Sequence, residues 1–94
     1  MSETFDDYLE MARALMGSHD TDAELVEANG YVNIAIQLRP RSGDAWILKS
    51  QILSSLEDDA AALAAAEMAV RRMPRSAESL YVRAAVLADM QRYA

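Results

Sequence analysis

The side chains of this 94-residue sequence that could carry chemistry are one histidine and two close pairs of carboxylates. His19 stands alone in a polar turn, and a single histidine cannot form a metal cluster. The pairs Asp20/Asp22 and Asp58/Asp59 fall where helix caps belong, which favours capping over catalysis. The sequence has no cysteine, glycine-rich phosphate loop, nucleophile elbow or metal-ligand spacing. It therefore predicts a protein that is not an enzyme and that needs no cofactor.

Charge is distributed unevenly along the chain, whose net charge is −6. Residues 1–29 carry eight acids and one base, whereas residues 30–94 carry seven acids and eight bases. An acidic surface repels phosphate backbones and anionic lipids, so we expect no binding to nucleic acid or to membranes. Two readings of the acidic third remain open, a solvated helix face and a docking surface for a basic partner.

Composition and hydropathy indicate where the protein resides. With 52% hydrophobic and 26% charged residues, the chain has the composition of a folded, soluble protein. Its longest apolar run, residues 60–66, is far shorter than the roughly 20 residues of a membrane helix. The acidic residues Glu3, Asp6 and Asp7 stand where a secretory signal would need basic residues. We therefore expect a cytoplasmic protein.

Apolar residues at helical spacing, separated by a few helix-breaking residues, predict five helices. The expected ranges are 4–16, 21–39, 42–56, 60–73 and 76–90. Gly17 is the expected stop of the first helix, and Thr21 with Glu24 is expected to form a capping box that opens the second. Ser42 and Asp44 are the two candidate caps of the third helix, and Ser76 is expected to cap the fifth. The fold class is therefore all-α.

The tripeptide Pro40-Arg41-Ser42 recurs as Pro74-Arg75-Ser76, 34 positions later, and the residues that follow the two copies run parallel in chemical type. This period indicates a repeat architecture in which each copy ends one helix pair and opens the next. Neither helix of a pair can bury its apolar stripe alone, so stacked pairs must share a core. Close stacking should need small residues, which are expected at Ser50, Ala62, Ala69 and Ala84.

The repeat unit resembles the tetratricopeptide repeat (TPR) family, and the match covers about residues 42–94. The family's pattern is an opening aromatic, a small residue four positions later, two alanines in the second helix and a closing proline. These positions are occupied here by Trp46, Ser50, Ala62, Ala69 and Pro74. The resemblance implies a right-handed stack of antiparallel helix pairs.

The same resemblance implies one domain over residues 1–94, with three unequal parts. Residues 1–41 would form a degenerate first repeat, in which about half a dozen extra residues are expected to lengthen the connection between the two helices. Residues 42–76 would form the complete repeat. Residues 77–94 would supply the first helix of a third repeat or a capping helix.

TPR proteins usually bind an extended or helical peptide in a concave face lined by the first helix of each pair. The resemblance places that groove at Asp44, Ile47, Gln51, Ser54, Ser55, Glu78, Tyr81, Ala85, Ala88 and Asp89. Ile47 and Tyr81 would anchor an apolar or amphipathic peptide whose basic residues meet the acids. Carboxylate-clamp co-chaperone activity is not expected, because Ile47 and Gln51 do not supply the cationic pocket of that TPR class.

The fifth predicted helix carries apolar residues around a wide arc, so an apolar patch should remain at its end of the stack. The residues expected to be exposed there are Val82, Val86, Met90 and Tyr93. Three explanations are open: a homodimer through this helix, a partner that covers it, or a longer repeat array.

Two functions from different classes fit these features. The first is a non-enzymatic interaction module or scaffold that binds a protein or peptide partner in its groove. The alternative is a small, acidic secretion-type chaperone that holds an apolar segment of its client.

Overall fold

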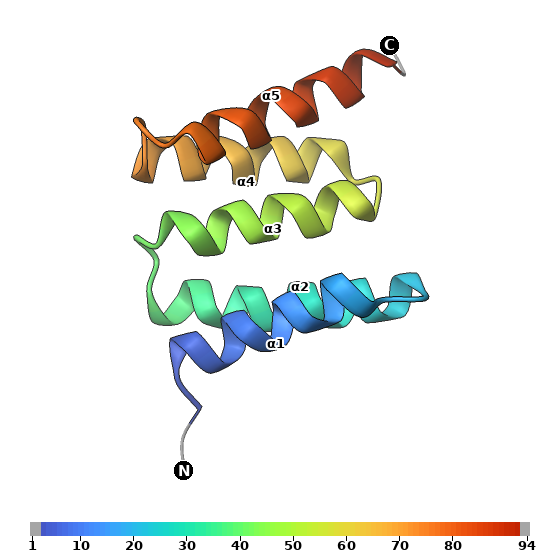
Figure 1. Ribbon diagram of the computed structural model, residues 1–94, viewed down its shortest axis with the longest axis vertical. Coiled ribbons are helices and arrows are strands. Elements are labelled where there is room, and N and C mark those ends of the chain that lie inside the picture. Colours follow the sequence, from blue (N-terminus) through green and yellow to red (C-terminus); the bar gives the residue numbers. More distant parts are fainter. Residues whose placement is uncertain (1–2, 93–94) are drawn as a thin grey trace.

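The computed structural model describes residues 3–92, which form five α-helices joined by short turns (Figure 1). The helices are α1 (Phe5–Ser18), α2 (Asp22–Leu38), α3 (Gly43–Ser55), α4 (Asp59–Arg72) and α5 (Ala77–Arg92). The predicted all-α class and the number of helices are confirmed. No helix within residues 3–92 is both long enough and apolar enough to cross a membrane.

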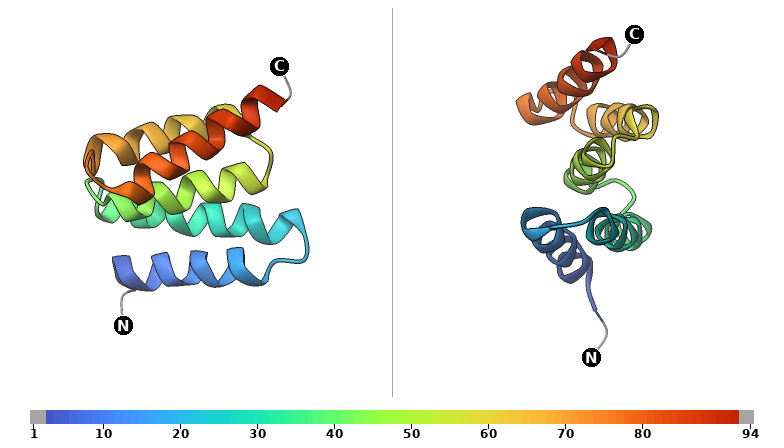
Figure 2. Two further views of the ribbon diagram at one scale, coloured as in Figure 1. Left: turned by 45° about the horizontal axis from the view of Figure 1, so that its top comes forward. Right: turned by 90° about the vertical axis from the view of Figure 1, so that its right-hand side faces the viewer.

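The helices stack in two layers along the longest axis of the molecule. Successive helices run antiparallel, with α1, α3 and α5 in one layer and α2 and α4 in the other (Figure 2, right). The stack measures 46 × 32 × 17 Å, so it is only about two helices thick. Within residues 3–92, α2, α3 and α4 therefore have a neighbouring helix on both sides along the stack, whereas α1 and α5 have neighbours on one side only.

Side-chain caps set the start of four helices. The hydroxyl or carboxylate oxygens of Thr4, Ser42, Asp58 and Ser76 each accept a hydrogen bond from the backbone N–H three residues later. Thr4 forms a complete capping box, because its own N–H donates to the Asp7 carboxylate at 2.9 Å. The predicted caps at Ser42, Asp58 and Ser76 are confirmed.

Two predicted features of the first helix pair were wrong. Gly17 does not stop α1, because it keeps a negative φ inside the helix, and the chain leaves the helix at His19 in an extended conformation. Thr21 precedes α2, but its side chain makes no capping bond. The Glu24 carboxylate instead accepts from the backbone N–H of Asp20 at 3.2 Å, one residue before the expected partner.

The two Pro-Arg-Ser turns have the same backbone hydrogen bonds. The N–H groups of Arg39 and Met73 each donate to the carbonyl four residues earlier, at 2.9 and 2.8 Å. Those of Ser42 and Ser76 each donate to the carbonyl three residues earlier, at 3.1 Å in both turns. The period of the sequence is therefore also a period of the structure.

The first hairpin differs from the second in helix length, although a longer connection had been predicted. Three residues join α1 to α2, and three join α3 to α4. α2 has 17 residues and α4 has 14, and α1 exceeds α3 by one. Tyr8 and Ala12 of α1 therefore precede Trp46 and Ser50 of α3 by 38 positions. The prediction was wrong because the extra residues extend helices.

α3 is buried on two sides and joins the two hairpins into a continuous core. Leu48 and Ile52 pack on the side of α1 and α2, in a cluster with Leu25 and other apolar residues of that hairpin. Ile47 and Leu53 pack on the opposite side, against α4 and α5. Because α3 contributes apolar residues on both of its sides, loss of packing on either side should weaken the contact between the hairpins.

A polar contact also crosses between the hairpins. The Lys49 Nζ of α3 donates to the Asn33 Oδ1 of α2 at 2.7 Å and lies 5.7 Å from the centre of the Trp46 ring. Burial of this ammonium group lowers the pKa of Lys49 below its ordinary value. The contact therefore satisfies a partly buried charge at the joint between α2 and α3.

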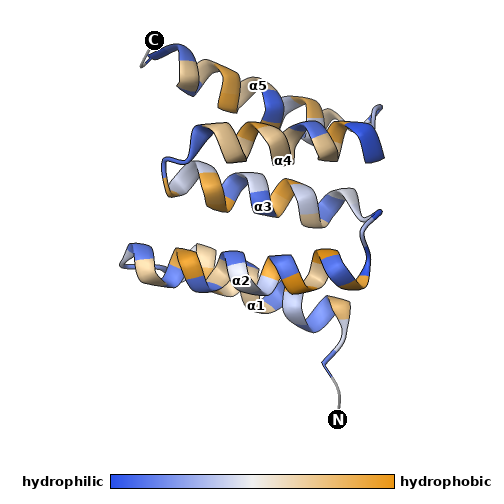
Figure 3. Cartoon of the chain, turned by 180° about the vertical axis from the view of Figure 1, so that it is seen from behind, coloured by the Kyte–Doolittle hydropathy of each residue, from blue (hydrophilic) through white to orange (hydrophobic). Residues whose placement is uncertain are grey.

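The side of α4 that faces α3 and α5 consists of alanine. The buried residues of this helix are Ala62, Ala65, Ala66 and Ala69, and the pale orange of alanine covers much of α4 in Figure 3. The predicted close-packing roles of Ser50, Ala62 and Ala69 are confirmed, since each is fully buried. The prediction for Ala84 was wrong. It is exposed, because no described helix covers that side of α5.

Ser50→Ala is expected to lower the free energy of unfolding by about 0.5–1 kcal/mol. The Ser50 Oγ donates to the carbonyl oxygen of Ala62 at 2.8 Å in the buried joint of α3 and α4. Urea unfolding measures the change. Ser54→Ala, on the same helix but only half-buried, is the matched control and should be close to neutral. Equal losses in both variants would contradict a role for the buried bond.

Candidate binding groove

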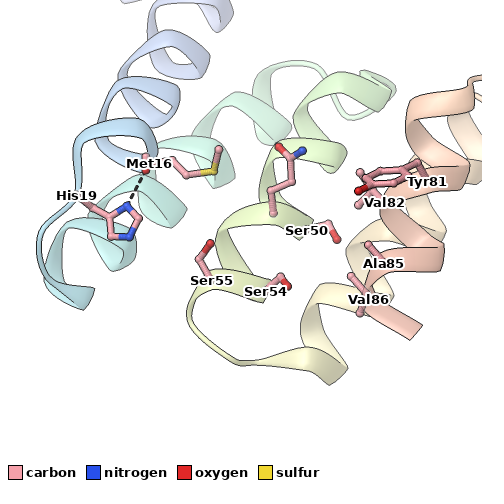
Figure 4. Close-up of a pocket in the computed structure, with 10 residues that line it drawn as sticks. Met16, His19, Ser50, Ser54, Ser55, Tyr81, Val82, Ala85 and Val86 are labelled. Atoms are coloured by element: carbon pink, nitrogen blue, oxygen red, sulfur yellow. Dashed lines mark hydrogen bonds between the residues drawn. The ribbon is translucent and has the colours of Figure 1, made fainter. Parts of the chain in front are cut away.

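A cavity of about 450 Å³ opens on the face of the molecule formed by α1, α3 and α5 (Figure 4). The C-terminal end of α1 borders one side of it, α5 borders the other, and α3 lies between them. The lining residues are Met16, His19, Ser50, Gln51, Ser54, Ser55, Tyr81, Val82, Ala85 and Val86. Three helices of one layer therefore contribute to a single concave site.

The lining of this cavity contains no acidic side chain, lysine or arginine. Gln51, Ser54 and Ser55 contribute an amide and hydroxyl groups from α3, while α5 contributes mainly apolar groups. Tyr81 is 73% exposed, so its ring stands at the border of the cavity with little burial in the free protein. A mixed apolar and hydroxyl surface of this kind suits an uncharged segment of a ligand.

His19 lies at the α1 border of the cavity. Its Nδ1 is 2.6 Å from the carbonyl oxygen of Met16, as the dashed line in Figure 4 shows. Because a carbonyl oxygen can only accept, the Nδ1 carries the proton, and the Nε2 is the nitrogen that can contact a ligand. This contact fixes the orientation of the ring at the end of α1.

A second hollow of about 410 Å³ shares Ser54 with the cavity and is acidic. Its other lining residues are Glu57, Asp59 and Asp89. Glu57 adopts a left-handed conformation with φ of 62° where the chain turns from α3 to α4. The groove is thus neutral in its main cavity and negatively charged at the neighbouring end.

The structure brings together about half of the residues that were predicted to form the groove. The main cavity includes Gln51, Ser54, Ser55, Tyr81 and Ala85, and the acidic hollow adds Asp89. Asp44, Glu78 and Ala88 are exposed but line neither hollow. The prediction of Ile47 as an accessible anchor was wrong, because this residue is 3% exposed and packs with alanines of α4 and with Val82.

The predicted exposed face of α5 was also wrong in part. Val82 and Val86 are 5% and 2% exposed, because they pack back against α3 and α4. Met90 is partly buried against the same core, and Tyr93 lies outside the described residues. The large apolar side chains that α5 exposes are instead Leu80, Tyr81 and Leu87.

The predicted groove lacked seven residues that line the two hollows, which are Met16, His19, Ser50, Val82 and Val86 in the main cavity and Glu57 and Asp59 in the acidic one. Met16 and His19 lie on the first hairpin, where the 34-position offset of the repeat does not apply. At the offset of 38 that relates α1 to α3, Met16 corresponds to Ser54 and His19 to Glu57, which both line the groove. The aromatic and small residues Tyr8 and Ala12 carried the signal for this second offset.

The two hollows differ in charge, since the main cavity is neutral and the smaller one is acidic. Within residues 3–92, no three or more histidines and carboxylates are arranged to hold a metal ion. Comparisons with protein-family models, curated proteins and solved structures found no match for the chain.

Proposed function

We propose that this chain is a non-enzymatic protein-interaction module of the TPR type, which acts in the cytoplasm and binds a peptide in the groove of α1, α3 and α5. The observation that carries this proposal is the neutral cavity, lined by three helices of one layer and continued by an acidic hollow. The repeat period supports the TPR assignment, because it recurs in the sequence and in the hydrogen bonds of both turns.

The two hollows define the chemistry of the peptide. An apolar side chain would enter the main cavity between Gln51 and Ala85, with the ring of Tyr81 packed over it. A lysine or arginine a few residues away would meet Asp89 and its neighbouring acids beyond Ser54. The proposed ligand is therefore a short segment with one apolar anchor and a nearby basic residue.

Tyr81→Ala is expected to weaken binding of such peptides by roughly tenfold or more, because an aromatic contact at the border of a pocket contributes strongly to affinity. The probes are synthetic twelve-residue peptides with one central leucine, methionine or tyrosine and one lysine or arginine at varied spacing. The peptides are arrayed and probed with the full chain, and the affinity of each peptide that binds is then measured by isothermal titration. Tyr81 is exposed in the free protein, so its replacement should leave the fold intact.

Two further variants sharpen this test. Asp89→Lys should weaken peptides that carry a basic residue while sparing versions in which that residue is glutamine. Leu38→Ala, an exposed position on α2 in the other layer, is the control and should not change affinity. Unchanged affinity in Tyr81→Ala for every bound peptide would overturn the assignment of the groove.

A further inference from the structure

One side of α5 has no helix over it within residues 3–92. Its residues are Ala77, Leu80, Ala84 and Leu87, which recur at helical spacing and which we call the outer face of α5. All four are exposed, with Leu80 at 39% and Leu87 at 43%. In Figure 1, α5 lies at the end of the stack, so this helix has a described neighbour on one side only. None of the four residues carries a charge.

The internal repeat shows what covers this face elsewhere in the molecule. The equivalent residues of α3, 34 positions earlier, are Gly43, Trp46, Ser50 and Leu53. Trp46 and Leu53 pack on alanines of α4, and the Ser50 Oγ donates to the Ala62 carbonyl of the same helix. In α3, this set of positions is therefore the surface that binds α4.

The opposite sides of α3 and α5 are used in the same way. Leu48 and Ile52 of α3 pack towards the preceding hairpin, and their repeat equivalents in α5, Val82 and Val86, do the same. α5 therefore packs on the α3–α4 hairpin in the same way as α3 packs on the α1–α2 hairpin. The two helices differ on the outer face, which α4 covers in α3, and at its edge, where Ile47 is buried and its equivalent Tyr81 is 73% exposed.

We propose that the outer face of α5 binds a helix from a partner protein as α3 binds α4, and that this helix presents alanine or other small residues at the spacing of α4. Leu80 and Leu87 project from the face, so a partner must be small where it meets them. A second copy of the chain cannot supply such a stripe from α4, because the alanines Ala62, Ala66 and Ala69 are fully buried in each copy. This surface is distinct from the groove.

One difference between α3 and α5 adds specificity. A Cβ atom on Gly43 would lie 2.6 Å from the side chain of Met73, so α3 needs glycine beneath that methionine. The equivalent residue of α5 is Ala77, so the partner needs a residue smaller than methionine there. Because the face is uncharged, the affinity should depend little on salt.

The probe for this surface is a synthetic peptide with the sequence of residues 57–74, which includes α4, in two versions: unchanged and with Met73→Ala. Each peptide is titrated into the isotope-labelled full chain and followed by nuclear magnetic resonance. The amide signals of Ala77, Leu80, Ala84 and Leu87 should shift, and the Met73→Ala peptide should bind roughly fivefold more tightly or better. Higher salt should change its affinity by less than about twofold.

The double variant Leu80→Glu/Leu87→Glu should abolish these shifts, because it places two charges in an apolar contact. Both side chains are exposed, so circular dichroism should show an unchanged fold. Val26→Glu is the matched control, since Val26 is 60% exposed on α2. Gln51→Ala, at a groove position on α3, should leave binding of this peptide intact, which separates the outer face from the proposed groove function.

Three outcomes would overturn the proposal. The first is no binding of either peptide at near-millimolar concentration. The second is a shift pattern centred on the groove residues Gln51 and Ala85. The third is a dimer, detected by sedimentation, that the Leu80→Glu/Leu87→Glu variant dissociates, because the occupant of the face would then be a second copy of the chain.

Discussion

Replacing Ala62 by leucine is expected to lower the free energy of unfolding by about 1–3 kcal/mol or more. Ala62 is fully buried at the joint of α3 and α4, and its carbonyl oxygen lies 2.8 Å from the Ser50 Oγ. Three additional carbon atoms have no space there, so the two helices must move apart or the side chain must adopt a strained rotamer. A domain of this size should lose roughly 5–20 °C in melting temperature, measured by circular dichroism.

The control for this prediction lies on the same helix. Ala64→Leu makes the same chemical change at an exposed position of α4, so it should alter stability by less than about 0.5 kcal/mol. The two variants share composition and nearly the same helix propensity, which isolates the contribution of packing. A melting temperature of Ala62→Leu equal to that of the parent would contradict the close contact of α3 with α4.

The sequence was sufficient to predict the helices and the α3–α4 joint because both depend on local patterns. Ser42, Asp58 and Ser76 cap helices within three residues of themselves, so capping could be recognised without knowledge of the fold. Small residues at helical spacing, such as Ala62 and Ala69, similarly indicated a close contact between helices. Long-range partners were not needed for either inference.

The exposed side of α5 could not be predicted because its apolar residues point in several directions. Val82 and Leu80 are two positions apart and equally apolar in type, but one is buried and the other exposed. Hydropathy alone cannot select a side, since the selection depends on which neighbouring helices are present. Leu48 and Trp46 of α3 occupy the same two sides as Val82 and Leu80, but the helices that cover each side are known only from the structure.

The prediction of the groove was incomplete, because the burial of each residue also depends on the neighbouring helices. Ile47 lies next to groove positions on α3, but a large apolar residue gains more from burial than from exposure, and it packs against α4. Met16 and His19 escaped prediction because the helices of the first hairpin are longer, which changes the offset from 34 to 38 positions. Errors therefore arose where a single period was applied to hairpins of unequal length.

Ile52→Ala is expected to lower the free energy of unfolding by about 2–5 kcal/mol, because it leaves a cavity at a fully buried position. Ile52 packs in the cluster through which α3 contacts the first hairpin. The substitution should therefore weaken the contact between the two hairpins, which contributes to stability as in other stacked repeats. Denaturant unfolding, followed by helical circular dichroism and by the fluorescence of Trp46, can detect the weaker contact between the hairpins.

Trp46 is the single tryptophan and packs on the α4 side of α3, so its fluorescence reports on the second hairpin. In the parent, the two signals should change together, as expected for one cooperative unit. In Ile52→Ala, circular dichroism should decline at lower denaturant than fluorescence, because α1 and α2 separate first. Ile34→Ala, at a position 36% exposed on α2, is the control and should cost less than about 1 kcal/mol. Coincident transitions in Ile52→Ala with a loss as small as in that control would show that α3 does not couple the hairpins.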